Sequence, residues 1–232
     1  MILETVLFAA LAPAVDFDDA VCQGLNDIQC DLSVVSANRA ELRKINKDFA
    51  MGYEAKSGMM QWKEPMKLRL SSNMNGEKII YIVSGDKQSY LIQRFNLRKN
   101  DDLSKDPGRH QTLFDFGLIT KSISQQFLKG TFVRTEPDGT NVFDVNYRYD
   151  KDKTRYRIWV HPTKKYIEKR VWYNRRGQLM ASFEYSDPVQ SNGIWMCSRV
   201  TVKNAENQVA GVSQYSNIKT NIGLSDSLFR LN

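Results

Sequence analysis

Short segments of alternating apolar and polar residues, separated by turn-forming clusters, run through most of this sequence. In the segment 179–185 every second residue is apolar or aromatic, and the cluster NRRGQ precedes it. Strict alternation is typical of a strand with one buried face, and Asn, Gly, Asp and Ser supply the tight reversals between strands. After Thr131 such strands and turns follow one another to the end of the chain. The pattern predicts an antiparallel sheet of about eleven strands, which must curl to hide one face.

The first half contains the same pattern with two interruptions. In MKLRLSS, Met66, Leu68 and Leu70 fall on one face, and KIIYIVSG and QSYLIQRF follow across short turns. We expect residues 98–112 to form a polar loop, because RKNDDLSKDPGRHQT has no periodicity. No linker composition or internal repeat divides the chain, so we expect residues 15–232 to form a single domain.

Two helices are expected beside the strands. Asp16, Asp18 and Asp19 crowd the start of a short helix over 16–26, where carboxylates favour the exposed amides. The second is an amphipathic helix over 115–128, ended by Gly130. Its apolar face has the spacing 3, 4, 4, with Phe116, Ile119, Ile123 and Phe127. With so few helices, we expect them inside or across the mouth of the curled sheet, as a lid.

The first fourteen residues have the character of a secretory signal peptide. The stretch 2–14 is apolar apart from Glu4 and Thr5 and ends in Ala-Pro-Ala, a small-x-small cleavage pattern. The first basic residue is Arg39, so the basic start of a signal peptide is missing and a buried N-terminal helix is the alternative. We predict export to the periplasm. Three cysteines match no metal or redox motif, and in an oxidising compartment Cys22 and Cys30 could pair, with Cys197 buried in a strand.

Charge and motifs point away from nucleic acid and catalysis. The net charge of +7 permits attraction to anions without demanding it. A basic hairpin is interpreted as a solvated outer sheet face rather than a nucleic-acid surface; its members are Lys164, Lys165, Lys169, Arg170, Arg175 and Arg176. His110 and His161 are interpreted as solvated or turn residues, and no nucleophile elbow, phosphate loop or metal motif occurs. We therefore expect no enzyme, no cofactor and no bound metal.

Large apolar side chains are abundant in the predicted strands. All four tryptophans fall there, and methionine adds adaptable apolar volume; the tryptophans are Trp62, Trp159, Trp172 and Trp195. A curled sheet with so few helices has more apolar lining than its helices fill, which predicts a lipid-sized groove.

Three stretches resemble the outer-membrane lipoprotein carrier family, with the LolA/LolB-like fold. They are GMMQWKEPMKLRL, VWYNRRGQLMASFEYSDPVQSNGIWMCSRVTV and YSNIKTNIGLSDSLFRL, and the resemblance covers most of residues 16–231. It implies an unclosed antiparallel barrel with a helical lid and a hydrophobic cavity for acyl chains. The implied function is a periplasmic carrier, monomeric, that moves lipid or lipoprotein toward the outer membrane. The implied partners are an inner-membrane transporter and an outer-membrane receptor.

The resemblance also suggests which side chains line the cavity. The expected lining is Trp62, Met66, Leu68, Leu70, Phe116, Ile119, Ile123, Phe127, Phe143, Val145 and Tyr147. One position departs from the family, whose carriers place an arginine before the proline that corresponds to Pro65, where it holds the lid by hydrogen bonds. Here that residue is Glu64. The alternative function is a non-catalytic envelope scaffold that binds a protein or polysaccharide, which would have a filled interior and an exposed aromatic patch.

Overall fold

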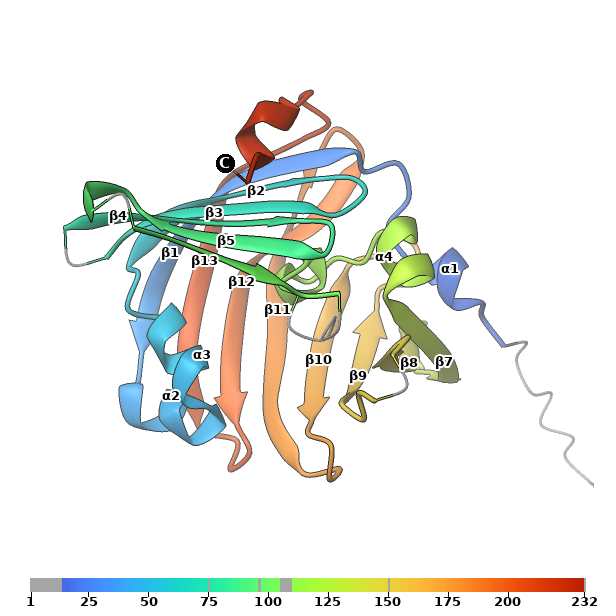
Figure 1. Cartoon of the computed structure of the whole chain (residues 1–232). Coiled ribbons are helices and arrows are strands. Elements are labelled where there is room, and N and C mark those ends of the chain that lie inside the picture. The colour runs from blue at the N-terminus through green and yellow to red at the C-terminus, as the bar shows by residue number, and fades with distance from the viewer. Residues whose placement is uncertain (1–13, 75, 96, 105–109, 150, 232) are drawn as a thin grey trace, which may run out of the picture.

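One curled antiparallel sheet dominates the molecule (Figure 1). The computed structural model describes residues 14–74, 76–95, 97–104, 110–149 and 151–231. Within these residues, thirteen strands form a single sheet in the order β6-β5-β4-β3-β2-β1-β13-β12-β11-β10-β9-β8-β7. The predicted mainly β, unclosed antiparallel barrel is confirmed, with two more strands than the approximate count from the sequence. The expected signal peptide lies almost wholly outside the described residues.

The sheet consists of two meanders joined at its centre. The first arm contains β1 (Asp27–Ala37), β2 (Ser57–Lys63), β3 (Lys67–Met74), β4 (Glu77–Ser84), β5 (Lys87–Ile92) and β6 (Leu97–Asp102). The second arm contains β7 (Leu128–Thr135), β8 (Asn141–Tyr147), β9 (Arg155–Val160), β10 (Ile167–Tyr173), β11 (Leu179–Ser191), β12 (Ile194–Asn204) and β13 (Val209–Thr220). β1 pairs with β13, while β6 and β7 are the two edges. Figure 1 shows the first arm crossing over the face of β10 to β13.

Alternation places the side chains as the sequence predicts. In β8, Phe143 and Val145 are fully buried, whereas Asp144 between them accepts hydrogen bonds from Arg155 and Arg157 on β9. In β12 every second side chain from Ile194 to Asn204 is buried, and Cys197 is the one buried residue in the other phase. All four tryptophans lie in strands, as expected.

The helices are short and lie at the ends of the sheet. They are α1 (Phe17–Ala20), α2 (Arg39–Ile45), α3 (Lys47–Gly52) and α4 (Lys121–Gln126), with the 3-10 turns η1 (Gln93–Phe95), η3 (Leu113–Phe116) and η4 (Asp226–Phe229). Asp16 caps α1 by accepting from the amide of Asp18. The predicted helix over 16–26 therefore begins where expected but ends after a single turn.

The predicted helix over 115–128 is wrong. The chain instead forms η3, then an extended step, then α4, because Gly117 adopts φ 87° and ends the first turn. The amide of Cys22 donates to the carbonyl of Ile119 at 2.8 Å, as part of an isolated parallel bridge between Cys22 and Thr120. That carbonyl is therefore engaged outside any helix. Gly130 does not end a helix: it lies in β7, and the ring of Phe17 occupies the space where a Cβ would stand.

The predicted polar loop at 98–112 is also wrong at its start. Residues 97–102 form the edge strand β6, which pairs with β5 over its whole length. Most of its side chains are exposed. An edge strand with two wetted faces has no apolar alternation to reveal it in the sequence.

The C-terminal segment covers the outer face of the first arm. Phe229 of η4 packs with Ile80, Ile82 and Leu224 in a cluster separate from the main core. Asp27 holds this segment: its carboxylate accepts from the amides of residues 222, 223 and 224 at 2.8–3.1 Å.

The cysteines do not form the pair that was considered. Cys22, Cys30 and Cys197 are free thiols and all are buried. Burial raises the pKa of Cys22 to about 11 and those of Cys30 and Cys197 to about 12. Thiols protonated to this degree are poor nucleophiles.

Candidate functional site: the concave cavity

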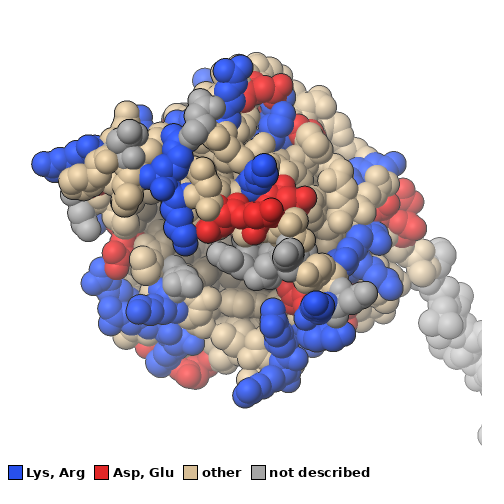
Figure 2. All heavy atoms as spheres, viewed as in Figure 1, with Lys and Arg blue, Asp and Glu red and all other residues tan. Residues whose placement is uncertain are grey.

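A hollow of about 1060 Å³ lies on the concave side of the sheet. Every strand except β7 contributes to its wall, together with η3 and α3. Figure 2 shows the hollowed face of the molecule, with lysine and arginine side chains on either side of the hollow. The volume lies slightly above the usual range of about 300–1000 Å³ for small-molecule sites.

The cavity wall is partly apolar and partly tyrosine. Its apolar portions include Phe49, Leu70, Ile79, Phe183, Val200 and Val202. Six tyrosines also line it: Tyr53, Tyr81, Tyr90, Tyr147, Tyr156 and Tyr215. Burial raises the pKa of Tyr156 to about 12, and it raises those of Tyr53, Tyr81, Tyr147 and Tyr215 as well. These hydroxyls therefore stay protonated and can donate hydrogen bonds inside the cavity.

A buried ion pair is part of this wall. Arg170 of β10 donates from Nη1 to Oδ1 of Asp115 at 2.9 Å, and only 4% of its side chain is exposed. The guanidinium carbon lies 4.1 Å from the ring centre of Phe183 and 4.8 Å from that of Phe114. Arginine stacks well on aromatic faces, which explains how a charged side chain is accommodated here.

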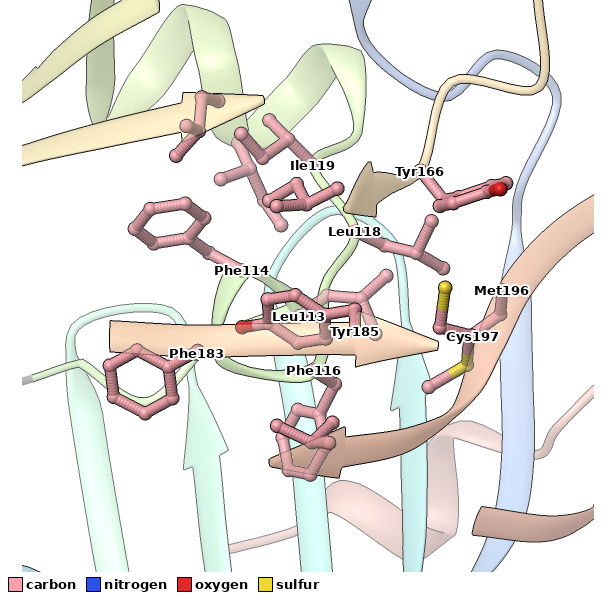
Figure 3. Close-up of a cluster of buried hydrophobic side chains, with 14 of the residues drawn as sticks. Leu113, Phe114, Phe116, Leu118, Ile119, Tyr166, Phe183, Tyr185, Met196 and Cys197 are labelled. Atoms are coloured by element: carbon pink, nitrogen blue, oxygen red, sulfur yellow. The ribbon is translucent and has the colours of Figure 1, made fainter. Parts of the chain in front are cut away.

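The 3-10 turn η3 positions Asp115 inside the curled sheet. Thr112 caps the turn, and Oδ2 of Asp115 accepts from the backbone amide of Thr112 at 3.1 Å. Figure 3 shows the apolar residues of η3 packed around Phe183 and Tyr185 of β11. Because Leu113 and Phe114 are buried, the turn is fixed and so is the carboxylate that it carries.

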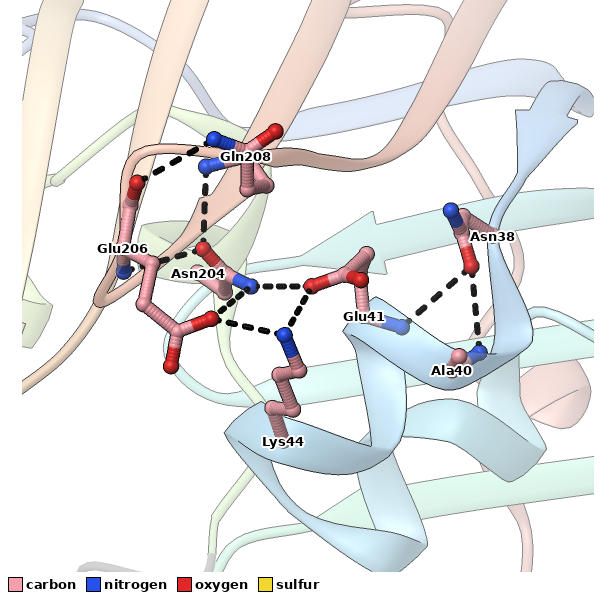
Figure 4. A network of polar contacts seen from close by, with 7 residues as sticks. All are labelled: Asn38, Ala40, Glu41, Lys44, Asn204, Glu206 and Gln208. Atoms are coloured by element: carbon pink, nitrogen blue, oxygen red, sulfur yellow. Dashed lines mark hydrogen bonds and ion pairs between the residues drawn. The ribbon is translucent and has the colours of Figure 1, made fainter.

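The helix α3 borders the cavity, and α2 precedes it in the chain. Phe49 and Tyr53 line the cavity from this side, and Gly211 leaves room for the Tyr53 ring, which would lie 2.5 Å from a Cβ there. A polar network ties α2 to the turn between β12 and β13 (Figure 4). In it, Lys44 bridges Glu41 and Glu206 at 2.9 and 2.7 Å.

Glu64, the residue that departs from the family pattern, contacts α4. Its carboxylate accepts a hydrogen bond from the Ser122 hydroxyl in the first turn of that helix. Burial raises the pKa of Glu64, although this hydrogen bond opposes the change. A second carboxylate reaches the same helix, because Asp18 accepts from the Ser124 hydroxyl at 2.7 Å. Two acidic side chains thus attach α4 to the molecule.

The structure divides the predicted cavity residues into two groups. Leu70, Phe116 and Tyr147 lie on the cavity wall. The remaining members pack into the main core away from it: Trp62, Met66, Leu68, Ile119, Ile123, Phe127, Phe143 and Val145. The sequence thus places these eight on the buried side of the fold but not on the surface of the hollow. Lipid binding by any of the eleven stays a prediction.

Two features of the wall were missed from the sequence. Arg170 was assigned to a solvated outer face, but it points inward, whereas the neighbouring Lys169 packs over Trp159 outside the cavity. Its phase with Trp172 two residues later was the available signal, since alternate residues share a face, but Val171 and Tyr173 make the opposite face equally large. The prevalence of tyrosine in the wall had no distinct signal, because tyrosine is common on both faces of strands.

The histidines lie in different settings. His110 is buried on the cavity wall, with Nε2 3.1 Å from the carbonyl of Gly85, so the interpretation as a solvated residue is wrong. His161 occupies a turn, as expected, where Nδ1 accepts from the amide of Lys164. Among the described residues, no group of three or more His, Cys, Asp or Glu could hold a metal ion. Within that same part of the chain, no helix has the length and apolar character needed to span a membrane.

Comparisons with known proteins agree with this architecture. A family model described as an uncharacterized protein matches residues 128–232, which is the second arm and the C-terminal segment. No curated protein matches the sequence. A solved domain from Vibrio parahaemolyticus, named for outer-membrane lipoprotein sorting, shares 12% identity at a TM-score of 0.57, with 90% of this chain and 91% of that chain covered.

Two further structures are similar. A LolA superfamily protein from Nitrosomonas europaea has 14% identity and a TM-score of 0.52, with 92% of this chain and 94% of that chain covered. A DUF1329 family protein from Desulfovibrio piger has the same identity and score, with coverage of 90% and 91%. This chain has the LolA-like fold.

Proposed function

We propose that this protein is a periplasmic carrier that binds the acyl chains of a lipid or lipoprotein in the concave cavity and moves them toward the outer membrane. The observation that carries the proposal is the hollow of about 1060 Å³, walled by nearly every strand. The similarity to a domain named for lipoprotein sorting supports it. An inner-membrane transporter and an outer-membrane receptor are the proposed partners, and residues 1–14 the proposed export signal.

Binding energy would come from removing hydrocarbon from water. Each buried methylene contributes about 0.8 kcal/mol, so eight of them give about 6 kcal/mol before entropy losses. Apolar side chains on facing parts of the curled sheet, such as Leu70 of β3 and Val202 of β12, provide the contacts. No step of this function requires a nucleophile or a metal.

The test is lipid binding with and without a blocked cavity. Native mass spectrometry and lipid extraction of the purified full chain are expected to show co-purified lipid, and the neutral probe N-phenyl-1-naphthylamine is expected to gain fluorescence. Leu70→Trp fills the cavity and should weaken probe binding at least tenfold. Leu179→Trp is the matched control, because Leu179 is 40% exposed and lies outside the cavity lining.

Absence of both lipid and probe binding in the native chain would contradict the carrier function. Equal binding by the two tryptophan variants would place any bound lipid outside the cavity. In either case a scaffold that binds a protein or polysaccharide becomes the better explanation.

A further inference from the structure

The guanidinium of Arg170 has donors that its protein partners do not satisfy. Its one side-chain hydrogen bond among the described residues runs from Nη1 to Asp115. Nε is buried and has no acceptor in that part of the chain. The guanidinium carbon also lies near two aromatic rings, those of Phe114 and Phe183. What remains is the edge formed by Nε and Nη2, and such a fork matches the two oxygens of a carboxylate.

A second unsatisfied donor lies close by on the same strand. Trp172 follows Arg170 by two residues on β10, so both side chains project to the concave face. Its indole Nε1 is also buried without an acceptor among the described residues. Buried donors are rarely left unpaired, and each exception calls for an explanation. A third such donor among the described residues, Nε1 of Trp62, lies away from the cavity, whereas these two share one strand of its wall, where a bound ligand would supply the acceptor.

We propose that Arg170 and Trp172 form a head-group site for a long-chain fatty acid anion, whose hydrocarbon tail lies along the apolar part of the cavity. This inference rests on the proposed lipid-binding function and specifies the ligand class. A singly charged carboxylate fits better than a dianionic phosphate, because Asp115 already offsets the charge of Arg170, and Lys99 and Asp101 on the same wall pair with each other. Nε of Arg170 and Nε1 of Trp172 are both closed to solvent. The carboxylate therefore reaches them only after a local rearrangement of side chains, which is common on binding.

The experiment measures head-group preference by titration calorimetry on delipidated full chain at pH 8. The ligands are dodecanoate, dodecanol, dodecyl phosphate and inorganic phosphate. Dodecanoate should bind at least tenfold more tightly than dodecanol, and inorganic phosphate should not bind. Arg170→Met keeps the aliphatic stem and removes the charge. It should reduce the affinity for dodecanoate to that for dodecanol, while the affinity for dodecanol stays within twofold of the native value.

The matched control is Lys169→Met on the same strand. Lys169 stacks near Trp159, outside the cavity lining, so this variant should retain the native preference. If Arg170→Met fails to fold, as judged by circular dichroism, Trp172→Phe removes one donor and keeps an aromatic ring. It should weaken dodecanoate binding about threefold or more and leave dodecanol binding unchanged.

The outcomes separate this inference from the carrier function. If neither dodecanoate nor dodecanol binds, the proposed function fails and the head-group site fails with it. If both bind equally and the variants change neither, the carrier function stands and the head-group site is overturned. Tighter binding of dodecyl phosphate than dodecanoate, or binding of inorganic phosphate alone, would overturn the assignment to a carboxylate.

Discussion

Replacing Gly117 with alanine should destabilise the protein through two separable effects. Gly117 adopts φ 87°, a left-handed conformation that costs an alanine about 1–2 kcal/mol. In addition, an alanine Cβ would lie 2.8 Å from Cδ1 and 2.9 Å from Cε1 of Tyr185. Tyr185 is only 6% exposed, so its ring cannot swing into solvent. Forcing extra volume into a packed interior costs about 1–3 kcal/mol, and the sum is about 2–5 kcal/mol.

The matched control is Gly177→Ala in the turn between β10 and β11. Gly177 has φ 75°, but a Cβ there would meet nothing within 4 Å. This variant therefore carries only the backbone cost of about 1–2 kcal/mol. Urea unfolding followed by tryptophan fluorescence gives both free energies from the midpoints and slopes.

The expected difference between the two variants is about 1–3 kcal/mol, with Gly117→Ala the less stable. If the unfolding free energies of the two variants agree within about 0.5 kcal/mol, the Tyr185 ring moves aside without cost. That result would refute the argument that η3 is fixed by close packing against β11. A changed urea slope would instead point to a breakdown of two-state unfolding.

Two further predictions concern carboxylates that hold segments in place. Asp27→Asn replaces one of the oxygens that bind the amides of the C-terminal segment and removes the charge. We expect the free energy of unfolding to fall by about 2–4 kcal/mol and the Leu224 amide to exchange its hydrogen faster. An unchanged exchange rate would contradict this role of Asp27. Burial raises the pKa of Glu64 above its ordinary 4.5, so the folded protein binds this proton more tightly than the unfolded chain, and stability falls as pH rises from 4.5 through the folded-state pKa. Glu64→Gln should remove that dependence, so the melting temperature of the variant should rise relative to that of the native protein as the pH goes from 4.5 to 8. A difference in melting temperature that stays constant across this range would show that Glu64 is not the group responsible.

Period-two alternation sufficed to predict the strands of the second arm. In β12 every second side chain is buried, and in β8 Phe143 and Val145 are, because packing against a single curled face enforces that pattern. The edge strand β6 escaped detection for the same physical reason, because neither of its faces is covered.

The error over 115–128 shows the limit of spacing as a signal. Phe116, Ile119 and Ile123 are all buried, as a helical face would require, yet they do not share a helix: Phe116 ends η3, Ile119 lies in the extended step, and Ile123 lies in α4. The spacing of apolar residues indicates which residues are buried, but not the backbone conformation that buries them. Here a turn, a strand-like step and a short helix together bury the same positions that one continuous helix would. Gly117 was the one residue within the segment that spoke against a continuous helix.

The cavity was harder to predict than the fold around it. Leu70, Phe116 and Tyr147 were identified, but Arg170 was placed on the wrong side of β10. In that strand both faces carry large side chains, and the pairing with β9 shifts register between Ile167 and Lys169. The sequence alone does not reveal which phase faces the concave side after such a shift. Which residues line the cavity therefore depends on the curvature of the whole sheet.

The pairing of β1 with β13 has a consequence for how the chain reaches this structure. Within each arm every strand pairs with the strand next to it in sequence, so these contacts close only short loops. The β1 to β13 pairing is the single strand junction in the described sheet that joins distant parts of the chain. Contacts of high sequence separation slow folding, so that junction is where assembly is slowest. A chain divided between β6 and β7 would yield two fragments, each a complete meander, which would have to re-form this pairing together with the contacts of Asp27 to the C-terminal segment and of Phe17 to β7.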